Sequence, residues 1–233
     1  MSKTKTTKEY FDEWHPYDRL IQHNYMRHQE MIQCLRKHWL NSSKKRSSIL
    51  EVGCGNAYVV AEALSDQSDL DYTGIDLSAT ALAGAAKNLE QTDWTVNLLE
   101  GDALARIREL QGAFDGIVSG FSLHHFSVEE NLQLLKEMRR LLAPDGLMIV
   151  YDIVTREDES REDFLERLIA GVDLDAVQIT RSQMDTMSQH IRDYDFPIRL
   201  SSWQDLSVEA GFSDVTCEYR DEEEYYAFLR LSR

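Results

Sequence analysis

The sequence predicts an α/β fold in which a mostly parallel sheet carries helices on both faces. Three observations support this prediction. Apolar segments short enough for buried strands alternate with segments of helical periodicity from residue 49 onward. Ile49–Val52 runs directly into a glycine turn, and the turn leads into a helix. Leu147–Val154 is a nearly continuous apolar run, which is typical of a strand buried on both faces of a parallel sheet.

Length and composition agree with one α/β core and a small cap. The chain has 233 residues and a mass of 27.0 kDa, which is short for two full domains. No apolar run approaches the length of a membrane span, and Met1–Tyr10 lacks the apolar core of a signal peptide. The three cysteines, Cys34, Cys54 and Cys217, fit free thiols in a reducing compartment. We therefore expect a soluble, cytoplasmic protein without a membrane partner.

The net charge of −16 is unevenly distributed along the chain. Residues 1–48 carry ten Lys or Arg and five Asp or Glu, whereas residues 49–154 carry six and seventeen, and residues 155–233 carry nine and nineteen. An acidic body repels phosphate backbones, so we expect no nucleic-acid substrate unless the basic first segment made all of the contacts. A solvated helix face is the simpler explanation of that segment.

A glycine turn with a downstream carboxylate indicates a nucleoside-binding site. Gly53 and Gly55 have no Cβ, so a ligand can approach the backbone N–H groups of the turn closely. The helix expected over Tyr58–Leu64 would point its N-terminal amides at that ligand. Asp76 follows Gly55 by twenty-one residues, at the end of an apolar segment, where a Rossmann-like fold places the carboxylate that binds ribose hydroxyls. Each signal is weak alone, but the two together are strong.

Two residues distinguish this turn from the dinucleotide-binding version. Tyr58 stands three positions after Gly55, where a pyrophosphate site would have its third glycine, and Glu51 stands two positions before Gly53. A carboxylate repels a pyrophosphate but attracts a ligand with a cationic amino-acid end. The turn therefore favours a cationic nucleoside.

This order of residues resembles the class I S-adenosylmethionine-dependent methyltransferases. The likeness continues in residues 100–103 (EGDA), 114–119 (FDGIVS) and 141–146 (LLAPDG), which resemble the third motif, the fourth strand and the turn before the fifth strand of that family. It implies S-adenosyl-L-methionine as the cofactor, with Asp102 receiving the adenine amino group and the Ala103 N–H facing the ring. Ala57, where many members have a third glycine, is a mild departure.

The resemblance implies a Rossmann-like, seven-stranded, mostly parallel sheet with helices on both faces and an antiparallel last strand. The expected strands are residues 49–52, 72–76, 95–99, 114–119, 147–154, 215–219 and 225–231. Ser78 is the expected N-cap of a helix that ends at Leu89. A shorter helix is expected over Ala103–Leu110, and one over Trp203–Gly211. Ser127 and Glu130 form a capping box before a helix whose apolar side carries Leu134, Met138 and Leu141 toward the sheet.

Two helical segments outside the core are expected to cover the site. Residues 1–48 are expected to contain one or two helices, with Leu20, Met31, Leu35 and Trp39 in helical phase. Within them, Phe11-Asp12-x-Trp14 and Tyr17-Asp18 resemble the lid of small-molecule methyltransferases, including the quinone-biosynthesis branch. Tyr17 is the lid candidate. Residues 155–200 are expected to form a helical cap that selects the substrate. They carry two apolar stripes at helical spacing: Phe164, Leu165, Leu168 and Ile169 in one, and Met184, Met187 and Ile191 in the other. The alternative for this cap is a contact in a homodimer, and the sequence does not separate the two.

Histidines occupy the loop that follows the fourth strand. His124 and His125 would face the reacting methyl group, and a histidine titrating near neutrality suits removal of a proton from the acceptor. A packing role for these histidines is an equal alternative. His15, His23 and His28 are weaker candidates to line the site. Adjacent histidines are not a spaced ligand pair, and the sequence shows no complement of carboxylates, so we predict no metal.

These observations lead to one preferred function and two alternatives. The preferred function is S-adenosylmethionine-dependent methyl transfer (EC 2.1.1.-) to a small molecule, whose accepting atom (oxygen, nitrogen, carbon or sulfur) stays open. The alternatives are an NAD(P)-dependent oxidoreductase and a non-catalytic module that binds the cofactor and a partner protein. The loop after the fourth strand lacks the Asn/Asp-Pro-Pro-Tyr/Phe and Pro-Cys words of nucleic-acid methyltransferases, which favours a small acceptor.

The predicted organisation comprises four segments. Residues 1–48 form the helical lid, 49–154 the cofactor-binding core, 155–200 the cap insertion, and 201–233 the C-terminal helix and closing strands. The predicted catalytic residues are His124 and His125. The predicted cofactor-binding residues are Glu51, Gly53, Gly55, Asp76, Leu77, Asp102, Ala103, Ser119 and Tyr17.

Overall fold

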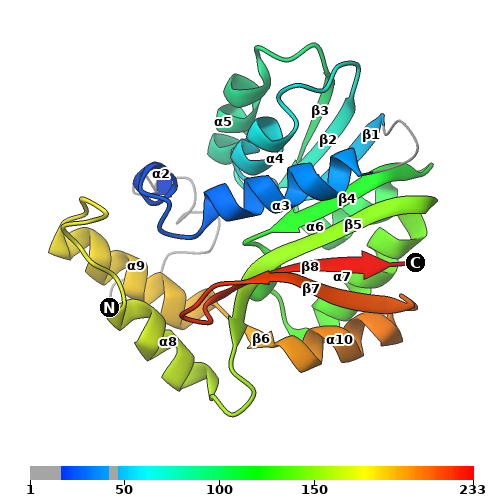
Figure 1. Cartoon of the computed structure of the whole chain (residues 1–233). Coiled ribbons are helices and arrows are strands. Elements are labelled where there is room, and N and C mark those ends of the chain that lie inside the picture. Colours follow the sequence, from blue (N-terminus) through cyan, green and yellow to red (C-terminus); the bar gives the residue numbers. More distant parts are fainter. Residues whose placement is uncertain (1–16, 42–46) are drawn as a thin grey trace.

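The computed structural model describes residues 17–41 and 47–233, and its centre is a mixed sheet (Figure 1). Seven strands follow the order β3-β2-β1-β4-β5-β8-β7, and a two-residue strand, β6, pairs with β5. The strands are β1 (Ser48–Val52), β2 (Asp71–Asp76), β3 (Thr95–Glu100), β4 (Phe114–Gly120), β5 (Leu142–Thr155), β6 (Ile198–Arg199), β7 (Asp214–Arg220) and β8 (Tyr226–Ser232). The predicted fold class is confirmed, and the short β6 is an addition to the seven expected strands.

The direction of the strands also follows the prediction. β1 to β5 are parallel to one another, whereas β8 is antiparallel to both β5 and β7. The chain moves outward from β1 to β2 and β3, and then returns to place β4 on the other side of β1. In open α/β sheets, ligands bind beyond the carboxyl ends of the strands where the strand order reverses. The topology therefore places a binding crevice beside the ends of β1 and β4.

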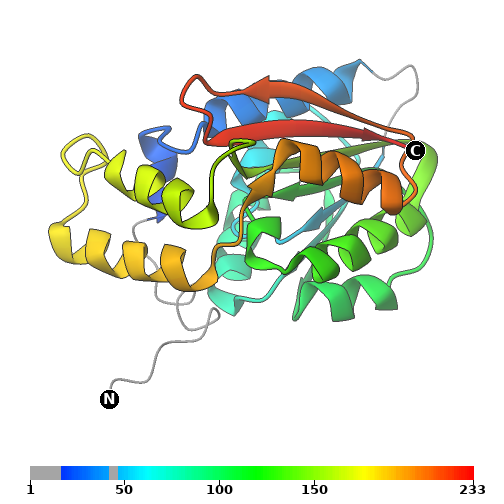
Figure 2. The same cartoon turned by 90° about the horizontal axis from the view of Figure 1, so that it is seen from below.

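Helices cover both faces of the sheet and enclose two hydrophobic cores (Figures 1 and 2). One face carries α3 (His28–Leu40), α4 (Tyr58–Ala63) and α5 (Ala79–Leu89). The other carries α6 (Ala103–Glu109), α7 (Val128–Leu141) and α10 (Leu200–Glu209), which begins three residues before the expected Trp203. Every apolar position predicted to face the core in α3 and α7 is buried: Met31, Leu35, Trp39, Leu134, Met138 and Leu141.

Side-chain caps fix the helix starts that border the crevice. The Ser78 hydroxyl accepts a hydrogen bond from the Ala81 N–H at 3.1 Å, so the predicted N-cap of α5 is confirmed. Ser127 and Glu130 form the predicted reciprocal capping box at the start of α7. These caps satisfy backbone N–H groups that would otherwise lack partners, and they fix where each strand–helix loop ends.

The start of β5 differs from the prediction. A turn was expected over residues 143–146 before the strand, but β5 already begins at Leu142. Leu142 pairs with Phe114 and Leu147 pairs with Gly116, so four residues of β5 bulge opposite Asp115. Pro144 lies in this bulge, and proline has no N–H to donate to a regular ladder. The turn residues were located correctly, but they interrupt the strand rather than precede it.

The cap consists of α8 (Arg161–Ala170) and α9 (Arg181–Tyr194), which lie beyond the sheet beside α2 (Tyr17–Gln22) (Figures 1 and 2). The predicted apolar stripes of both helices are buried, except for half-buried Ile169: Phe164, Leu165 and Leu168 in α8, and Met184, Met187 and Ile191 in α9. The Arg19 guanidinium of α2 donates to the Gln178 carbonyl in the loop between the cap helices. Within the described residues, no helix combines the length and apolar character that crossing a bilayer requires.

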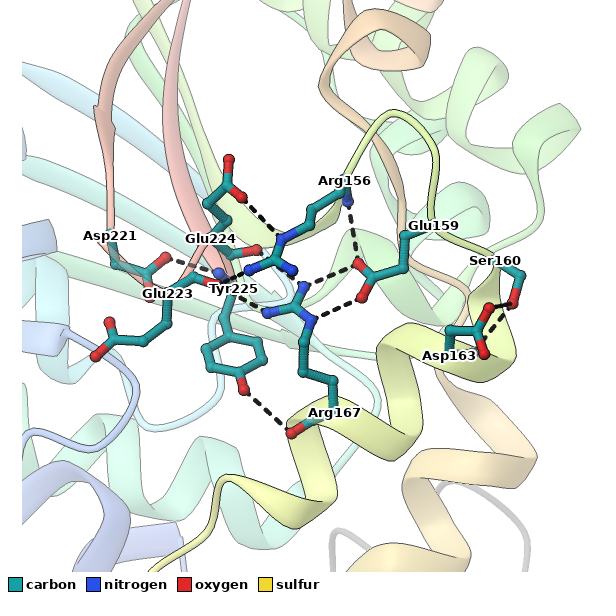
Figure 3. A network of polar contacts seen from close by, with 9 residues as sticks. All are labelled: Arg156, Glu159, Ser160, Asp163, Arg167, Asp221, Glu223, Glu224 and Tyr225. Atoms are coloured by element: carbon teal, nitrogen blue, oxygen red, sulfur yellow. Dashed lines mark hydrogen bonds and ion pairs between the residues drawn. The ribbon is translucent and has the colours of Figure 1, made fainter.

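A polar network fastens α8 to the hairpin of β7 and β8 (Figure 3). The Arg167 guanidinium donates to both carboxylate oxygens of Glu159, at 2.6 and 2.8 Å, and to the Glu223 carbonyl at 2.7 Å. It also lies 4.3 Å from the centre of the Tyr225 ring, whose hydroxyl donates to the Arg167 carbonyl. Arg156 pairs with Glu224 at 2.8 Å. Bidentate arginine contacts have a defined geometry, so this network sets the position of α8 relative to the sheet.

Candidate functional site

A cavity of about 530 Å³ opens at the carboxyl ends of β1, β2 and β4. Its walls come from the glycine turn, the ends of β2 and β3, the loop between β4 and α7, the cap, and the segment from α2 to the start of α3. Nine of the predicted site residues line it: Glu51, Gly53, Gly55, Asp76, Leu77, Asp102, Ala103, His124 and His125. Residues scattered over 75 positions of sequence therefore meet in one cavity, as the motif spacing predicted.

Ser119 is the predicted residue that the structure does not bring to this wall, and the prediction for Tyr17 is not tested. Ser119 is buried within β4, and its hydroxyl donates to the Val52 carbonyl at 2.8 Å. It thus fastens β4 to the start of the glycine turn. Tyr17 is the first residue of α2, and its side chain lies outside the described part of the structure.

The glycine turn needs both of its glycines. Gly53 and Gly55 have φ angles of 70° and 52°, in the left-handed region that L side chains rarely adopt. A Cβ on Gly53 would lie 1.9 Å from the Ser122 hydroxyl oxygen. The N–H groups of Gly53 and Cys54 donate to the Ile75 carbonyl at 2.8 and 2.9 Å, which binds the turn to β2. Ala57 also has a left-handed φ of 57°.

Asp76 connects the turn to the end of β2. One carboxylate oxygen accepts from the Gly55 N–H at 2.7 Å, and the other accepts from the Ser78 N–H at 2.9 Å. Burial raises the pKa of Asp76, and the backbone hydrogen bonds oppose that rise. Each carboxylate oxygen can accept two hydrogen bonds, so Asp76 keeps the capacity to bind ligand hydroxyls.

Glu51 is a buried carboxyl group at the cavity wall, with 3% of its surface exposed. The Tyr72 hydroxyl donates to it at 2.6 Å. Burial raises the pKa of Glu51 to about 8, although the Tyr72 hydrogen bond acts in the opposite direction. Glu51 is therefore largely protonated at neutral pH, and a cationic ligand would draw the proton off by stabilising the carboxylate.

Asp102 both caps α6 and faces the cavity. Its carboxylate accepts a hydrogen bond from the Ala105 N–H at 2.8 Å. The cap fixes the direction of α6 and leaves the neighbouring Ala103, also at the wall, as the first residue of the helix. We refer to Glu51, Gly53, Gly55, Asp76 and Asp102 as the glycine-turn end of the cavity.

His124 lies on a short 3-10 helix, η1 (Leu123–His125), between β4 and α7. Its Nδ1 is 2.5 Å from the Asp152 carboxylate, which also accepts the His124 backbone N–H at 3.1 Å. Burial opposes a charge on this imidazole, but the carboxylates of Asp152 and Asp195 overcome the penalty and raise the pKa of His124 to about 9. His124 is therefore protonated at neutral pH in the protein alone, and it would have to lose that proton before acting as a base.

Asp195 and His190 of the cap are site residues that the sequence reasoning missed. Asp195 follows α9 and lies 3.3 Å from His125 Nδ1 and 3.7 Å from His124 Nε2. Burial opposes the charge on Asp195, but the nearby histidines lower its pKa. Burial lowers the pKa of His190 to about 4, so this imidazole is uncharged at neutral pH. Its position on the apolar stripe of α9, three residues after Met187, was the available signal. We refer to His124, His125, Asp152, His190 and Asp195 as the histidine end.

Aromatic side chains form the wall between the two ends. Phe121 packs edge-on against Tyr151 and Tyr226, with ring centres 5.2 and 5.8 Å apart. Its φ of 48° is unusual for a bulky residue, and its N–H donates to the Tyr151 carbonyl at 2.8 Å. His28, one of the weaker sequence candidates, is buried against Phe121 at the wall. His23 is exposed and is not among the wall residues, and His15 lies outside the described residues.

The comparisons with known proteins agree with this geometry. Residues 49–146, from β1 to the bulge in β5, match the family described as "Methyltransferase domain". These residues form a class I methyltransferase domain. The resemblance inferred from the order Glu51, Gly53, Gly55, Asp76 and Asp102 is thereby confirmed.

Relatives match this methyltransferase domain over part of their length. The chain is 31% identical over 136 residues to the demethylmenaquinone methyltransferase of Staphylococcus epidermidis, which covers 57% of this chain and 54% of that protein. It is 32% identical over 84 residues to the ribosomal RNA small subunit methyltransferase C of Shewanella pealeana, covering 36% and 24%. The chain thus spans about half or less of these curated relatives.

A solved structure extends the likeness beyond the methyltransferase domain. The plantazolicin methyltransferase BamL superposes with a TM-score of 0.66 at 13% identity, covering 96% of this chain and 92% of that one. At this identity the match shows a shared fold. The shared fold therefore extends beyond residues 49–146.

Proposed function

We propose that this protein transfers a methyl group from S-adenosylmethionine to a small-molecule acceptor. The observation that carries the proposal is that Glu51, Gly53, Gly55, Asp76 and Asp102 line a single cavity together with a histidine cluster. The solved structure of the plantazolicin methyltransferase contains S-adenosylhomocysteine, the product of such a transfer. The demethylmenaquinone methyltransferases are named for a small-molecule substrate.

The glycine-turn end is suited to the proposed cofactor. Ribose hydroxyls would bind the Asp76 carboxylate, and the adenine would lie along Leu77, Asp102 and Ala103. The methionine end would then lie against Gly53 and Gly55, with its ammonium group near Glu51. Burial keeps the dielectric low around Glu51, so a positive charge there gains more than it would in water. We keep Tyr17 as the proposed lid residue.

The transfer itself asks the protein mainly for alignment and exclusion of water. A lone pair of the acceptor forms a bond to the methyl carbon while the carbon–sulfur bond breaks, and the sulfur keeps that electron pair. A hydroxyl acceptor also releases a proton. We assign the removal of this proton to the histidine end. His124 and His125 are the predicted catalytic residues there, and His190 is uncharged at neutral pH.

The cavity favours an acceptor that is small and largely apolar. Its wall contains Phe121, Tyr151, Tyr226, Met187 and Ile191, and the described wall residues include no lysine or arginine. Contacts to nucleic-acid phosphates come largely from such basic residues. The acidic body of the chain supports the same choice, so we propose a small molecule rather than RNA as the acceptor.

Calorimetric titration of the purified chain with S-adenosylmethionine, S-adenosylhomocysteine and NAD tests this proposal. Both sulfur nucleosides should bind, and NAD should not. Asp76→Asn should weaken their binding at least tenfold, because an amide replaces the carboxylate oxygens that hold the turn and the ribose. Asp71→Asn, at the exposed start of the same strand, is the matched control and should bind as the unaltered chain does. Binding of NAD alone would overturn the proposal in favour of an oxidoreductase.

A further inference from the structure

The histidine end brings three potential metal ligands to one point. His124 and His125 come from η1, and Asp195 comes from the end of α9. One ligand atom of each residue lies within 4.8 Å of the other two. The Asp195 carboxylate oxygen is 3.3 Å from His125 Nδ1 and 3.7 Å from His124 Nε2. Two ligands of a tetrahedral ion bound at 2.0–2.1 Å would lie about 3.4 Å apart, so the spacing of each imidazole nitrogen from Asp195 fits a shared ion. The ion would replace the contact of His125 Nδ1 with the Tyr194 carbonyl, which is 3.2 Å long.

Asp195 supplies an independent observation. Only 5% of its surface is exposed, and its Oδ1 lies 3.3 Å from His125 Nδ1 and 3.7 Å from His124 Nε2. A buried carboxylate needs a donor or a positive charge beside it. Protons on the two imidazoles supply that charge in the protein alone. A cation bound among the three groups would supply it in their place.

Asp152, on β5, holds the His124 ring on the side opposite Asp195. Its carboxylate contacts His124 Nδ1 and the His124 backbone N–H, and it is itself buried near the carboxyl end of β5. A histidine that binds a metal commonly donates its other ring N–H to a carboxylate, which fixes the ring and its tautomer. An ion would displace the proton of His124 Nε2, and with the other proton kept on Nδ1 by Asp152 the Nε2 lone pair would face the ion and Asp195. Asp152 is therefore a positioning residue for His124.

We propose that His124, His125 and Asp195 bind one divalent transition-metal ion. Two imidazole nitrogens and one carboxylate oxygen suit Zn²⁺ or Fe²⁺, and three protein ligands leave coordination positions open. The sequence predicted no metal because adjacent histidines lacked a carboxylate complement. The tertiary structure provides that complement, since the cap brings Asp195 to the histidines.

The proposed ion also defines a class of acceptor, and this part rests on the proposed methyl transfer. All three ligands line the cavity, so the open coordination positions would face the bound acceptor. A divalent ion binds oxygen ligands and lowers the pKa of a bound hydroxyl. The released proton would then leave to water, and His124 and His125 would hold the ion instead of acting as bases. The acceptor should accordingly carry a hydroxyl next to a second oxygen, such as a carbonyl or carboxylate on the adjacent carbon, on an otherwise apolar body.

Metal titration of the full chain tests the inference without reference to activity. The chelator-treated protein is titrated with Co²⁺, followed by its visible absorption, and with Zn²⁺, followed by calorimetry. We expect one ion per chain, with affinity at least tenfold weaker in Asp195→Asn. Asp152→Asn should weaken binding about 10–100-fold, as second-sphere changes commonly do. Asp193→Asn, two residues from Asp195 and outside the cluster, should leave the affinity unchanged.

Titration of each variant with S-adenosylhomocysteine separates the two proposals. A variant that binds the nucleoside but not the ion supports the metal site. The inference is overturned if the unaltered chain takes up no stoichiometric ion, or if Asp195→Asn binds it as tightly. If the unaltered chain does not bind S-adenosylhomocysteine, that result would instead contradict the proposed function. If Asp195→Asn fails to fold, His125→Gln takes its place.

Discussion

At the glycine-turn end of the cavity, backbone hydrogen bonds hold the functional groups, whereas at the histidine end side chains from distant segments hold one another. Gly53, Cys54 and Gly55 donate backbone N–H groups to Ile75 and Asp76. Each of these groups lies on a strand end or on the turn that follows it. The histidine end instead joins η1, β5 and the cap through contacts among His124, Asp152 and Asp195.

This difference predicts which end tolerates movement of the cap. The glycine-turn end is part of the sheet and keeps its shape as long as β1 and β2 remain paired. The histidine end is complete only when α9 is in place, because α9 carries His190 and Asp195 directly follows it. The Phe196 N–H, which donates to the His124 carbonyl at 2.6 Å, is one of the bonds that close this end. Cofactor binding and acceptor chemistry should therefore respond to different substitutions.

The largest effect is expected at the glycine turn. Gly53→Ala should destabilise the chain by about 2–4 kcal/mol and abolish S-adenosylhomocysteine binding, because the new Cβ meets Ser122 and the φ of 70° strains alanine. Thermal unfolding and calorimetry measure the two effects. Adding Ser122→Gly removes the steric clash and should restore more than half of the lost stability, with Ser122→Gly alone as the control. A stable, cofactor-binding Gly53→Ala variant would contradict a rigid turn.

An effect of similar size on stability, without the loss of the turn, should appear in its pH dependence. The pKa of Glu51 is raised to about 8, so its favourable contribution to folding is complete below pH 4.5 and is lost as the pH rises through 8. Denaturant unfolding at pH 5 and pH 9 should show Glu51→Gln losing about 2–4 kcal/mol less than the unaltered chain over this interval. Equal losses would mean that Glu51 is already ionised in the folded protein.

Glu51 also allows a test that involves the ligand. If the cationic end of S-adenosylmethionine lowers the pKa of Glu51, binding at pH 7 should release close to one proton per chain. Calorimetry in two buffers of different ionisation enthalpy measures this release. Glu51→Gln should release none, and a proton release that persists in that variant would assign it to another group.

The smallest effect on stability, and the sharpest separation of the two ends, is expected from Arg161. Its guanidinium donates to the carbonyls of Asp195 and Arg192, at 2.7 and 2.6 Å, and so holds the end of α9 against α8. Arg161→Met should cost about 1–2 kcal/mol and weaken metal binding about tenfold, while S-adenosylhomocysteine affinity changes less than twofold. Arg181→Met, at the exposed start of α9, is the matched control. An equal loss at both ends would contradict their independence.

Much of the architecture could be predicted because its signals are local. The apolar segments that became β1 to β4, β7 and β8, and the caps at Ser78 and Ser127, depend on residues within a few positions of one another. The bulge in β5 was misread as a preceding turn, since the sequence shows Pro144 and Gly146 but not the strand opposite them. Short β6 also escaped prediction, because two residues carry no periodicity.

The sequence by itself determined the glycine-turn end, because Gly53, Gly55 and Asp102 follow strands, Asp76 ends one, and parallel strands end at one edge of the sheet. The sequence also pointed to His124 and His125, but only the tertiary structure decided which residues complete the histidine end. His190 and Asp195 lie in a cap whose position is fixed by long-range contacts such as those of Arg161 and Arg167, so no local pattern links them to His124. A long-range contact also explains why Ser119 does not line the cavity as predicted. Its hydroxyl donates to the Val52 carbonyl on the neighbouring strand.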